Sequence, residues 1–455
     1  MKRTTLALPA TLYDQLRGWL ASPDELAGVL TARVVDDEGG TTLLGRALHS
    51  APGGTYLDQR HDGLALRSTG WVPAVRGAKK DSAMALFVHS HPRGLARFSE
   101  HDDVVDDALA STFVEHTGSS LYGSLVLAGD TGASELVGRL RRADGSTAGI
   151  DTIRITGDRL QLRRPSDRAE QPQDAFDRQI RALGADGQAT LAALRVGVVG
   201  AGGTGSAITE QLLRLGVRDL VIVDDDVVTP PTVTRGYGTG VRDAGRPKVE
   251  VLAELASRIG FGTQVTPVQG NARCKETICS LRHCDVVFCC VDGHAPRVAL
   301  SRWAYWHLAP VIDVGVLVSS DAGVIDSIDA RVTWLAPGAA CLLCRGRISP
   351  SLAYAEHLDP EERRRLAAQG YAPELDEPQP SVVPYTTLIA SWATTELLHR
   401  LFGFADPAPT EMLLRLHERA VRLNRLSPRE GCFCNNPARW GGGTAEPYLD
   451  LLWAG

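Results

Sequence analysis

The chain has 455 residues, of which 44% are hydrophobic and 22% charged, and this composition excludes a disordered or fibrous protein. Its formal net charge is −6 without long runs of one sign, so we expect no basic surface for nucleic acid. No apolar stretch reaches about 18 residues, and the N-terminus does not resemble a signal peptide. We therefore expect a cytoplasmic protein that neither crosses a membrane nor binds nucleic acid.

Apolar patterns predict alternating strands and helices along the chain. In the first part, a helix is expected at residues 10–21 and strands at 26–35, 41–48, 83–88, 121–128, 135–140 and 152–155. In the rest, strands are expected at 196–199, 220–223, 286–291 and 311–314, and helices at 206–215, 297–307, 361–368 and 386–400. This order is typical of an α/β fold that contains βαβ units.

The polar, arginine-rich stretch 157–173 is predicted to be a linker. It separates a first domain at residues 1–156 from a second domain at 174–440. Three consecutive glycines at 441–443 begin a C-terminal tail, 441–455, that we expect to be flexible.

The first candidate site follows the predicted strand 83–88. His89 and His91 are one residue apart, and Ser99 and Asp102 follow. Residues i and i+2 of a strand face the same side, so both imidazoles can bind one ion with Asp102 as a third ligand. Three protein ligands leave a position for water, as in a catalytic zinc site. A polar loop with incidental histidines is the alternative, although it does not account for all four residues.

This run resembles the JAMM motif of the JAB/MPN (Mov34) metalloproteases, which cleave bonds after the C-terminal glycine of ubiquitin-like proteins. The resemblance implies that His89, His91 and Asp102 bind zinc and that Ser99 helps to hold the oxyanion. It also implies a glutamate that acts as general base and then acid, near the start of the domain. Glu25 begins a matching segment, Glu-Leu-Ala-Gly-Val-Leu. A carboxylate exposed at a strand edge is the alternative for Glu25.

The second candidate site begins where the predicted strand 196–199 ends. Gly200, Gly202, Gly203 and Gly205 allow a tight turn and a close approach of the backbone to phosphate, at the start of a helix. Asp224 ends the next predicted strand, where a carboxylate can bind ribose hydroxyls. Taken alone, this pattern suggests a dinucleotide-binding Rossmann unit.

Charged residues around the glycine turn favour ATP over NAD. Arg235, Lys248 and Asp292 lie downstream of the turn, and Arg178 lies upstream. Several cations with one carboxylate suit a triphosphate with Mg²⁺ better than a nicotinamide. Lys248 is one of only five lysines among 48 basic residues, which suggests that its position needs a compact ammonium. For each residue taken alone, a solvated surface charge is the alternative.

Six stretches between about residues 175 and 435 resemble the ThiF/MoeB family of ubiquitin-activating-type adenylyltransferases. They are 176–179, the glycine turn at 200–206, 223–227, 232–235, 245–248 and 291–292. The resemblance implies a Rossmann-like adenylation domain, fused to a JAB/MPN-like α/β domain.

The same resemblance assigns roles within the nucleotide site. It implies that Asp224 binds the ribose, with Asp226 beside it, and that Arg235 and Lys248 bind the phosphates. Asp292 is expected to bind Mg²⁺. In a homodimer, Arg178 is expected to reach the γ-phosphate held by the other subunit. Thr232 stands where the family usually has Asn, and its hydroxyl can still donate one hydrogen bond to the nucleotide.

Four of the nine cysteines form two close pairs, Cys341 with Cys344 and Cys432 with Cys434. Two such pairs are typical of a structural zinc with four thiolate ligands, and the ThiF/MoeB resemblance implies a zinc at the corresponding places. Free or redox-active thiols are the alternative. Among the remaining cysteines, Cys289 and Cys290 are expected in the core, and Cys274 and Cys279 in helical surface or packing positions.

The motifs together predict two fused enzymes that act on the C-terminal tail of a ubiquitin-like protein. The first domain would trim or release the tail with zinc, and the second would adenylate its glycine with ATP, in a bacterial conjugation pathway. The alternative is activation and trimming of a sulfur-carrier protein for thiocarboxylate-dependent cofactor or cysteine biosynthesis. The acceptor partner is accordingly a conjugating enzyme or a sulfur donor. A non-catalytic scaffold would not need the metal and phosphate residues.

One absence bears on the choice between these two pathways. Ubiquitin-activating enzymes that form a thioester carry the catalytic cysteine in a crossover segment after the first zinc pair. Here no cysteine lies between Cys344 and Cys432, which favours the sulfur-carrier alternative. The fusion of the two domains favours conjugation.

Overall fold

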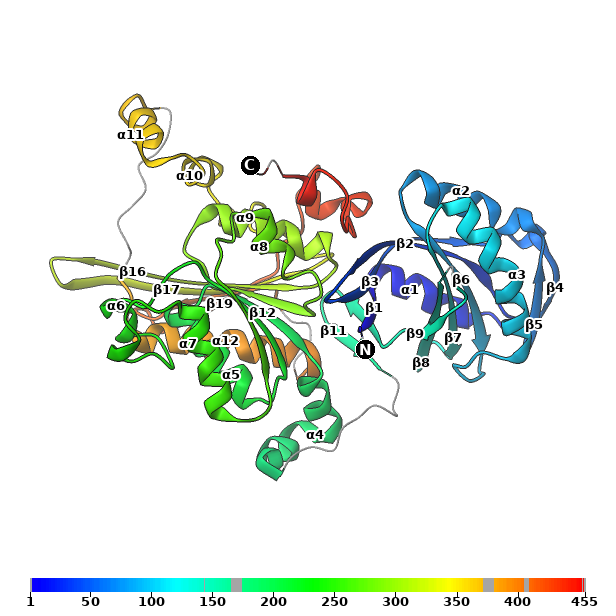
Figure 1. The fold of residues 1–455 in the computed structure, drawn as a ribbon, viewed down its shortest axis with the longest axis horizontal. Helices are drawn as coiled ribbons and strands as arrows, with labels where there is room; N and C mark the ends of the chain where they lie inside the picture. Colours follow the sequence, from blue (N-terminus) through cyan, green and yellow to red (C-terminus); the bar gives the residue numbers. More distant parts are fainter. Residues whose placement is uncertain are drawn as a thin grey trace. The chain divides into compact units, whose positions relative to one another are not determined.

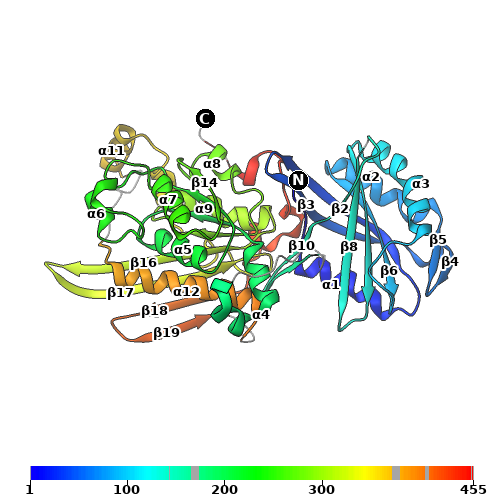
Figure 2. The same ribbon diagram turned by 60° about the horizontal axis from the view of Figure 1, so that its bottom comes forward.

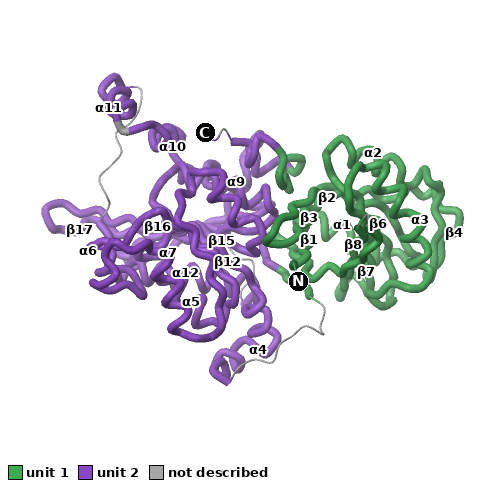
Figure 3. Tube along the Cα trace, in the orientation of Figure 1, with its two compact units in different colours: residues 1–157, 161–166, 437–445 green, residues 158–160, 167–436, 446–455 purple. Residues whose placement is uncertain are grey.

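The computed structural model describes residues 2–142, 144–164, 174–370, 380–404, 409–451 and 453. It divides into two compact units (Figure 3). Unit 1 comprises residues 1–157, 161–166 and 437–445, and unit 2 comprises 158–160, 167–436 and 446–455. No helix in the described ranges combines the length and the apolar character needed to span a membrane.

The N-terminal region is built on one mixed sheet with the strand order β11-β10-β1-β3-β2-β6-β7-β8-β9. The strands are β1 Thr4–Pro9, β2 Ala27–Asp37, β3 Gly40–Ser50, β6 Met84–Pro92, β7 Leu121–Gly129, β8 Ser134–Arg142, β9 Thr147–Gly149, β10 Thr152–Thr156 and β11 Leu160–Arg163. A separate hairpin joins β4 Tyr56–Arg60 to β5 Gly63–Leu66. The helices are α1 Ala10–Gly18, α2 Val72–Lys80 and α3 Glu100–Thr117 (Figure 1).

Two apolar clusters cover the two faces of this sheet. Leu12 and Leu16 of α1 join the first cluster, together with Leu30 of β2. Val75 of α2 and Phe113 of α3 join the second cluster. Because both faces are covered, the central strands are apolar at nearly every position, and the continuous run 83–88 could be recognised in the sequence as a buried strand.

Unit 2 contains a second sheet with the order β14-β13-β12-β15-β16-β17-β18-β19. Its strands are β12 Arg195–Val199, β13 Asp219–Val223, β14 Gln264–Val268, β15 Val286–Cys289, β16 Val311–Asp321, β17 Val324–Leu335, β18 Glu411–Arg415 and β19 Ala420–Asn424. The first five strands in space, β14 to β16, are parallel, and β17 to β19 continue antiparallel. Figure 2 shows the long β16–β17 hairpin next to β18 and β19.

Helices cover both faces of the unit 2 sheet. Those that pack on the sheet or precede it are α4 Asp177–Ala192, α5 Gly203–Arg214, α7 Lys248–Ile259, α9 His294–Trp306 and α12 Val383–Phe402. Shorter helices are α6 Pro230–Val233, α8 Lys275–Cys279, α10 Pro350–Ala355 and α11 Pro360–Ala368. In Figure 1, α5, α7 and α12 lie on one side of the sheet, and α8 and α9 lie on the other.

The glycine turn joins β12 to α5 and fixes how closely they approach. Gly200 has φ of 94°, a left-handed conformation that favours glycine. A Cβ atom at Gly205 would lie 1.7 Å from the carbonyl oxygen of Gly200, and one at Gly200 would lie 2.7 Å from the carbonyl oxygen of Cys290. The turn therefore brings the ends of β12 and β15 and the start of α5 into backbone contact, which no larger residue permits.

The C-terminal residues differ from the predicted flexible tail. Gly441, Gly442 and Gly443 are buried. Arg46 donates to the carbonyl oxygens of Ala438 and Trp440, and Arg33 donates to that of Gly442 at 3.1 Å. These bonds attach residues 437–445 to unit 1. The three glycines have no side chains, so their backbone can lie flat against β2 and β3.

Residues 446–451 instead belong to unit 2. The hydroxyl of Tyr448, which is fully buried, lies 2.9 Å from His307 Nε2. Arg302 donates to the backbone oxygen of Asp450 at 2.8 Å. The predicted linker also begins with ordered structure, since β11 lies within it, whereas residues 165–173 of that linker lie outside the described residues.

We expect Gly205→Ala to destabilise unit 2, because the added methyl group would overlap the Gly200 carbonyl oxygen. Overpacking of this kind costs roughly 1–3 kcal/mol. Gly202→Ala is the matched control, since no atom lies within 4 Å of a Cβ at that position. Urea unfolding followed by circular dichroism measures both variants, and equal midpoints would contradict this account of the turn.

Candidate functional site

The first site lies at the end of β6 in unit 1. Strand pairing sets its geometry, because Ala27 of β2 pairs with His89 in antiparallel register. Continuing that register two residues outward places Glu25 beside His91, and Glu25 Oε1 lies 3.7 Å from His91 Nε2. The α3 helix supplies the remaining member, Asp102, from its first turn.

Three ligand atoms converge at this point. His89 Nε2 lies 3.0 Å from His91 Nε2 and 3.0 Å from Asp102 Oδ1. Ligands of a tetrahedral zinc with bonds of about 2.0–2.2 Å are roughly 3.3–3.6 Å apart, so a small adjustment fits an ion between them. A single proton on His89 Nε2 can form a hydrogen bond with only one of its two neighbours, whereas one cation can be bound by all three atoms. These residues can therefore hold a metal ion.

Ser99 and Asp102 form a capping box at the start of α3. The Ser99 backbone N–H and hydroxyl donate to Asp102 Oδ2 at 2.6 and 2.8 Å, and the Asp102 N–H donates to the Ser99 hydroxyl at 3.2 Å. Burial alone would raise the pKa of Asp102, but hydrogen bonds from His89 and Ser99 lower it below its usual range. The Ser99 hydroxyl thus orients Asp102, and its predicted oxyanion role stays a prediction.

Glu25 is buried, and the β4–β5 hairpin holds its backbone. Its N–H donates to the carbonyl oxygen of Arg60 at 2.9 Å, and its carbonyl oxygen accepts from Gln59 Nε2 at 3.0 Å. Burial raises the pKa of the Glu25 carboxyl to about 7, with an opposing effect from His89. A carboxyl with a pKa near neutrality can both accept and return a proton, which suits general acid–base catalysis.

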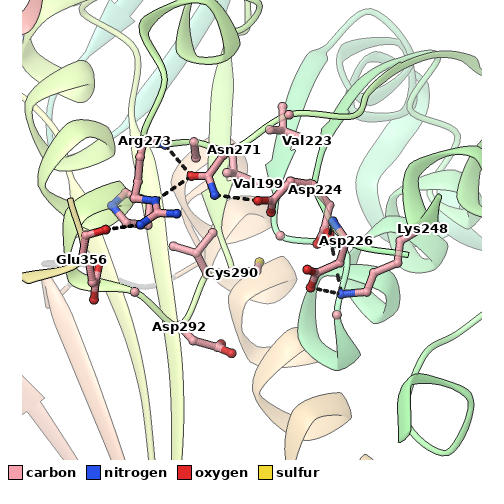
Figure 4. A pocket seen from close by; sticks show the side chains of 18 of the residues that line it. Val199, Val223, Asp224, Asp226, Lys248, Asn271, Arg273, Cys290, Asp292 and Glu356 are labelled. Carbon is pink, nitrogen blue, oxygen red and sulfur yellow. Dashed lines mark hydrogen bonds and ion pairs between the residues drawn. The ribbon is translucent and has the colours of Figure 1, made fainter. Parts of the chain in front are cut away.

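The second site is a cavity of about 320 Å³ in unit 2, at the carboxyl ends of the parallel strands. This size is at the lower end of the range for small-molecule pockets. The strand order reverses at β12, with β13 on one side and β15 on the other, which is where open α/β sheets bind ligands. Its wall includes residues that were predicted from the sequence: Gly200, Gly202, Asp224, Asp226, Arg235, Lys248 and Asp292. Figure 4 labels the three aspartates and Lys248.

Asp224 and Lys248 form a partly buried ion pair on one wall. Lys248 Nζ lies 3.5 Å from Asp224 Oδ1 and 2.6 Å from Asp226 Oδ2. Asp224 also accepts from the N–H of Ala201 in the glycine turn at 2.5 Å. Burial raises the pKa of Asp224, and Lys248 opposes that shift. The ion pair therefore fixes a carboxylate and an ammonium at the mouth of the turn.

Two further charged residues of the wall form no close ion pair within the described part of the chain. Within the described ranges, neither the Arg235 guanidinium nor the Asp292 carboxylate has an ion pair or a side-chain hydrogen bond. Asp292 does interact electrostatically with the Arg297 guanidinium. A guanidinium and a carboxylate without a close ion pair are suited to bind a polyanion and a metal ion, respectively.

Other predicted residues are not in the wall. Gly203 and Gly205 lie in the first turn of α5, where they permit close packing. The Thr232 hydroxyl lies 3.0 Å from that of Thr229 and accepts from the Thr229 N–H at 3.2 Å, so it caps α6. Arg178 is exposed at the start of α4, away from the pocket of its own chain.

The structure adds pocket residues that were not predicted. Asn271 and Arg273 follow β14, and Glu356 follows α10. The β14 sequence, Gln-Val-Thr-Pro-Val, is too polar to have been recognised as a strand. Cys290 also lines the cavity, so its predicted place in the core is wrong, whereas Cys289 is fully buried as predicted. Cys290 differs because it comes after the last residue of β15, at the edge of the sheet.

The four paired cysteines form a third cluster. The Sγ atoms of Cys341 and Cys432 lie 3.6 Å apart, as do those of Cys344 and Cys434. All four Sγ atoms lie within 4.8 Å of one another. Tetrahedral zinc with bonds of about 2.3 Å separates its sulfur ligands by roughly 3.8 Å. The cluster can therefore hold a metal ion, and the C-x-C spacing of the second pair is compatible with it.

Family comparisons match both units. The ThiF family matches residues 176–434, and the prokaryotic homologs of the JAB domain match residues 9–140. Among solved structures, Escherichia coli MccB has a TM-score of 0.47 and 13% identity, with 60% of this chain and 75% of that chain covered.

Three curated relatives match part of the chain. The SAMP-activating enzyme E1 of Haloferax volcanii is 30% identical over 36% of this chain and 57% of that protein. The molybdopterin-synthase adenylyltransferase of Escherichia coli is 31% identical over 30% of this chain and 56% of that protein. The tRNA threonylcarbamoyladenosine dehydratase 2 of Saccharomyces cerevisiae is 30% identical over 45% of this chain and 49% of that protein. The chain thus spans about half the length of these relatives.

We expect the two metal-binding clusters to lose their ions independently. His91→Ala should remove the ion from the histidine cluster only, and Cys344→Ser should remove it from the cysteine cluster only, because each ion needs its full ligand set. Metal analysis of purified protein should then give about two ions per chain in the unchanged protein and about one in each variant. His116→Ala, a histidine in α3 outside the cluster, is the control. Unchanged metal content in either cluster variant would contradict its assignment.

Proposed function

Because the chain belongs to the ThiF family and carries a prokaryotic JAB domain before it, we propose that it processes and activates one kind of protein tail. The tail is the C-terminal segment of a ubiquitin-like or sulfur-carrier protein that ends in glycine. Unit 1 cleaves the bond after that glycine, and unit 2 joins the resulting carboxylate to AMP. The observation that carries the proposal is the pocket wall in which Asp224, Lys248, Arg235 and Asp292 converge at the glycine turn.

The chemical need for this reaction is that a carboxylate is a poor electrophile. One oxygen of the glycine carboxylate attacks the α-phosphorus of ATP, the bond from that phosphorus to the bridging oxygen breaks, and pyrophosphate leaves. The product is a mixed anhydride whose AMP is a good leaving group. Charge moves onto the departing pyrophosphate, so cations fixed near it stabilise the transition state.

Each pocket residue has a role in this proposal. Asp224 binds the ribose hydroxyls, and Arg235 and Lys248 neutralise the phosphates. Lys248 can serve the nucleotide because Asp224 and Asp226 already hold its ammonium at the pocket mouth. Asp292 forms no close ion pair with a described residue and lines the pocket, where it would bind Mg²⁺, which would neutralise charge on the phosphates.

In unit 1, His89, His91 and Asp102 would hold zinc, which when bound would supply an activated water and polarise the carbonyl of the cleaved bond. Glu25 lies beside His91 and has a pKa raised by burial to about 7. Glu25 takes a proton from the attacking water and returns it to the departing amine. Ser99 keeps Asp102 oriented through the capping box.

Two of the three relatives support a protein tail as the substrate. These two are named for the activation of SAMP and of molybdopterin synthase.

Arg178 is exposed and does not line its own pocket, so in the proposed homodimer it reaches the nucleotide of the partner subunit. The cysteine cluster would hold a structural zinc.

We expect ATP–pyrophosphate exchange when a ubiquitin-like protein with a free C-terminal glycine is supplied. Lys248→Ala and Asp292→Ala should each lower the exchange rate about 10²–10³-fold, because removal of one transition-state contact costs about 2.7–4 kcal/mol. Lys275→Ala is the control, since Lys275 pairs with Glu446 outside the pocket wall. Exchange that is unaffected by the two pocket variants, or binding of NAD in preference to ATP, would contradict the proposal.

The positions of the cysteines favour the alternative function, which is activation of a sulfur-carrier protein. None lies between Cys344 and Cys432, so the segment that follows the first pair cannot form a thioester. Burial raises the pKa of Cys290 in the pocket, which makes it a poor nucleophile, and burial also raises that of Cys279. The reaction on this chain would then stop at the acyl-adenylate, and a sulfur donor or a conjugating enzyme would supply the nucleophile.

We therefore expect no covalent adduct on non-reducing electrophoresis after incubation with ATP, Mg²⁺ and the cognate modifier. Cys274, which is exposed, and Cys279 are the thiols to exclude first. A reducible adduct that disappears in Cys274→Ala or Cys279→Ala would show that this chain forms a thioester.

A further inference from the structure

The short helix α10 is tied at both ends to the start of α9. Before α10, the Ser349 N–H donates to His294 Nδ1 at 3.2 Å. After α10, the Glu356 carboxylate accepts from the N–H groups of His294 and Ala295 at 2.8 and 2.7 Å. A carboxylate at a helix N-terminus satisfies free N–H groups and interacts favourably with the helix dipole. Glu356 therefore fixes the end of α10 against α9.

Gly293 makes this contact possible. A Cβ atom at Gly293 would lie 2.9 Å from Glu356 Oε2, so a larger residue would displace the carboxylate. Gly293 directly follows Asp292, and both residues line the nucleotide pocket together with Glu356. The attachment of α10 is thus part of the pocket wall.

A chain of hydrogen bonds connects Glu356 to the opposite wall (Figure 4). Arg273 donates from its guanidinium to the backbone oxygen of Glu356. Asn271 Oδ1 accepts from the N–H and from Nε of Arg273 at 2.9 and 3.1 Å, and Asn271 Nδ2 donates to Asp225 Oδ2 at 2.6 Å. Asp225 lies between Asp224 and Asp226, in the segment that faces the proposed ribose and phosphates.

We propose that Glu356, Arg273 and Asn271 are positioning residues that couple nucleotide binding to the placement of α10. The inference rests on the proposed ATP site. A nucleotide that fixes the segment Asp224–Asp226 also fixes Asp225, and through Asn271 and Arg273 it favours the attached position of Glu356. Coupling of this kind is reciprocal, so loss of the attachment weakens nucleotide binding by the same factor.

Limited digestion with trypsin measures the placement of α10. Helix α11 begins four residues after Glu356 and offers cleavage sites at Arg363, Arg364 and Arg365. Full-length protein is digested with and without a saturating non-hydrolysable ATP analogue and Mg²⁺. Typical coupling energies correspond to about fivefold or more, so the analogue should slow cleavage at these sites at least about fivefold.

The variants separate coupling from simple destabilisation. Asn271→Ala and Arg273→Met should remove most of the protection by the analogue, even at saturation. Glu356→Gln keeps the shape of the side chain but loses its charge, so it should be cleaved faster and bind the analogue about tenfold more weakly. Glu276→Gln is the matched control, because Glu276 is an exposed carboxylate of α8 outside the pocket wall.

Direct titration with the analogue distinguishes a failure of the proposed ATP site from a failure of the proposed coupling. If the unchanged protein does not bind the analogue, the proposed ATP site fails, and the coupling fails with it. If the analogue binds but protects Arg273→Met as well as the unchanged protein, only the coupling is wrong. A Glu356→Gln variant that is less heat-stable but keeps the full protection and affinity would likewise overturn the inference, because the role of Glu356 would be structural only.

Discussion

The pocket of unit 2 depends on the contact between the Gly205 Cα and the Gly200 carbonyl group, which leaves no space for a side chain. This contact brings the start of α5 against the end of β12, and Gly200 in turn lies against the backbone of Cys290 after β15. Parallel strands that end at one edge then deliver Asp224, Asn271 and Asp292 to a common cavity from three separate loops. The pocket follows from backbone packing, and the charged side chains give it its chemistry.

In unit 1, strand register and helix capping position the residues of the candidate metal site. The antiparallel pairing of β2 with β6 sets Glu25 beside His91, and the capping box of α3 aims Asp102 at His89. One proton on His89 Nε2 cannot bond to both His91 Nε2 and Asp102 Oδ1, whereas one cation could bind all three atoms. In both units, the proposed chemistry lies where secondary-structure elements end, because backbone N–H groups and polar side chains are exposed there.

The sequence was most informative where spacing along the chain determines the site. The His89–Asp102 spacing, the glycine turn and the two cysteine pairs each lie on one or two elements, and the structure brings their members together. Elements and contacts that depend on tertiary packing could not be predicted from the sequence. Helix α3 and strands β17–β19 have mixed apolar patterns, and nothing near Glu356 indicates that α9 will receive its carboxylate. The glycines at 441–443 are typical of a spacer, and the bonds from Arg33 and Arg46 that hold this segment are tertiary contacts.

We propose that both units act in succession on one protein tail. The direct test uses a ubiquitin-like protein with a few extra residues after its glycine, and compares it with the mature form in ATP–pyrophosphate exchange. The account predicts that the unchanged protein supports exchange with both forms, whereas His91→Ala supports exchange with the mature form only. Equal exchange of His91→Ala with both forms, or no exchange with the mature form in either protein, would contradict it.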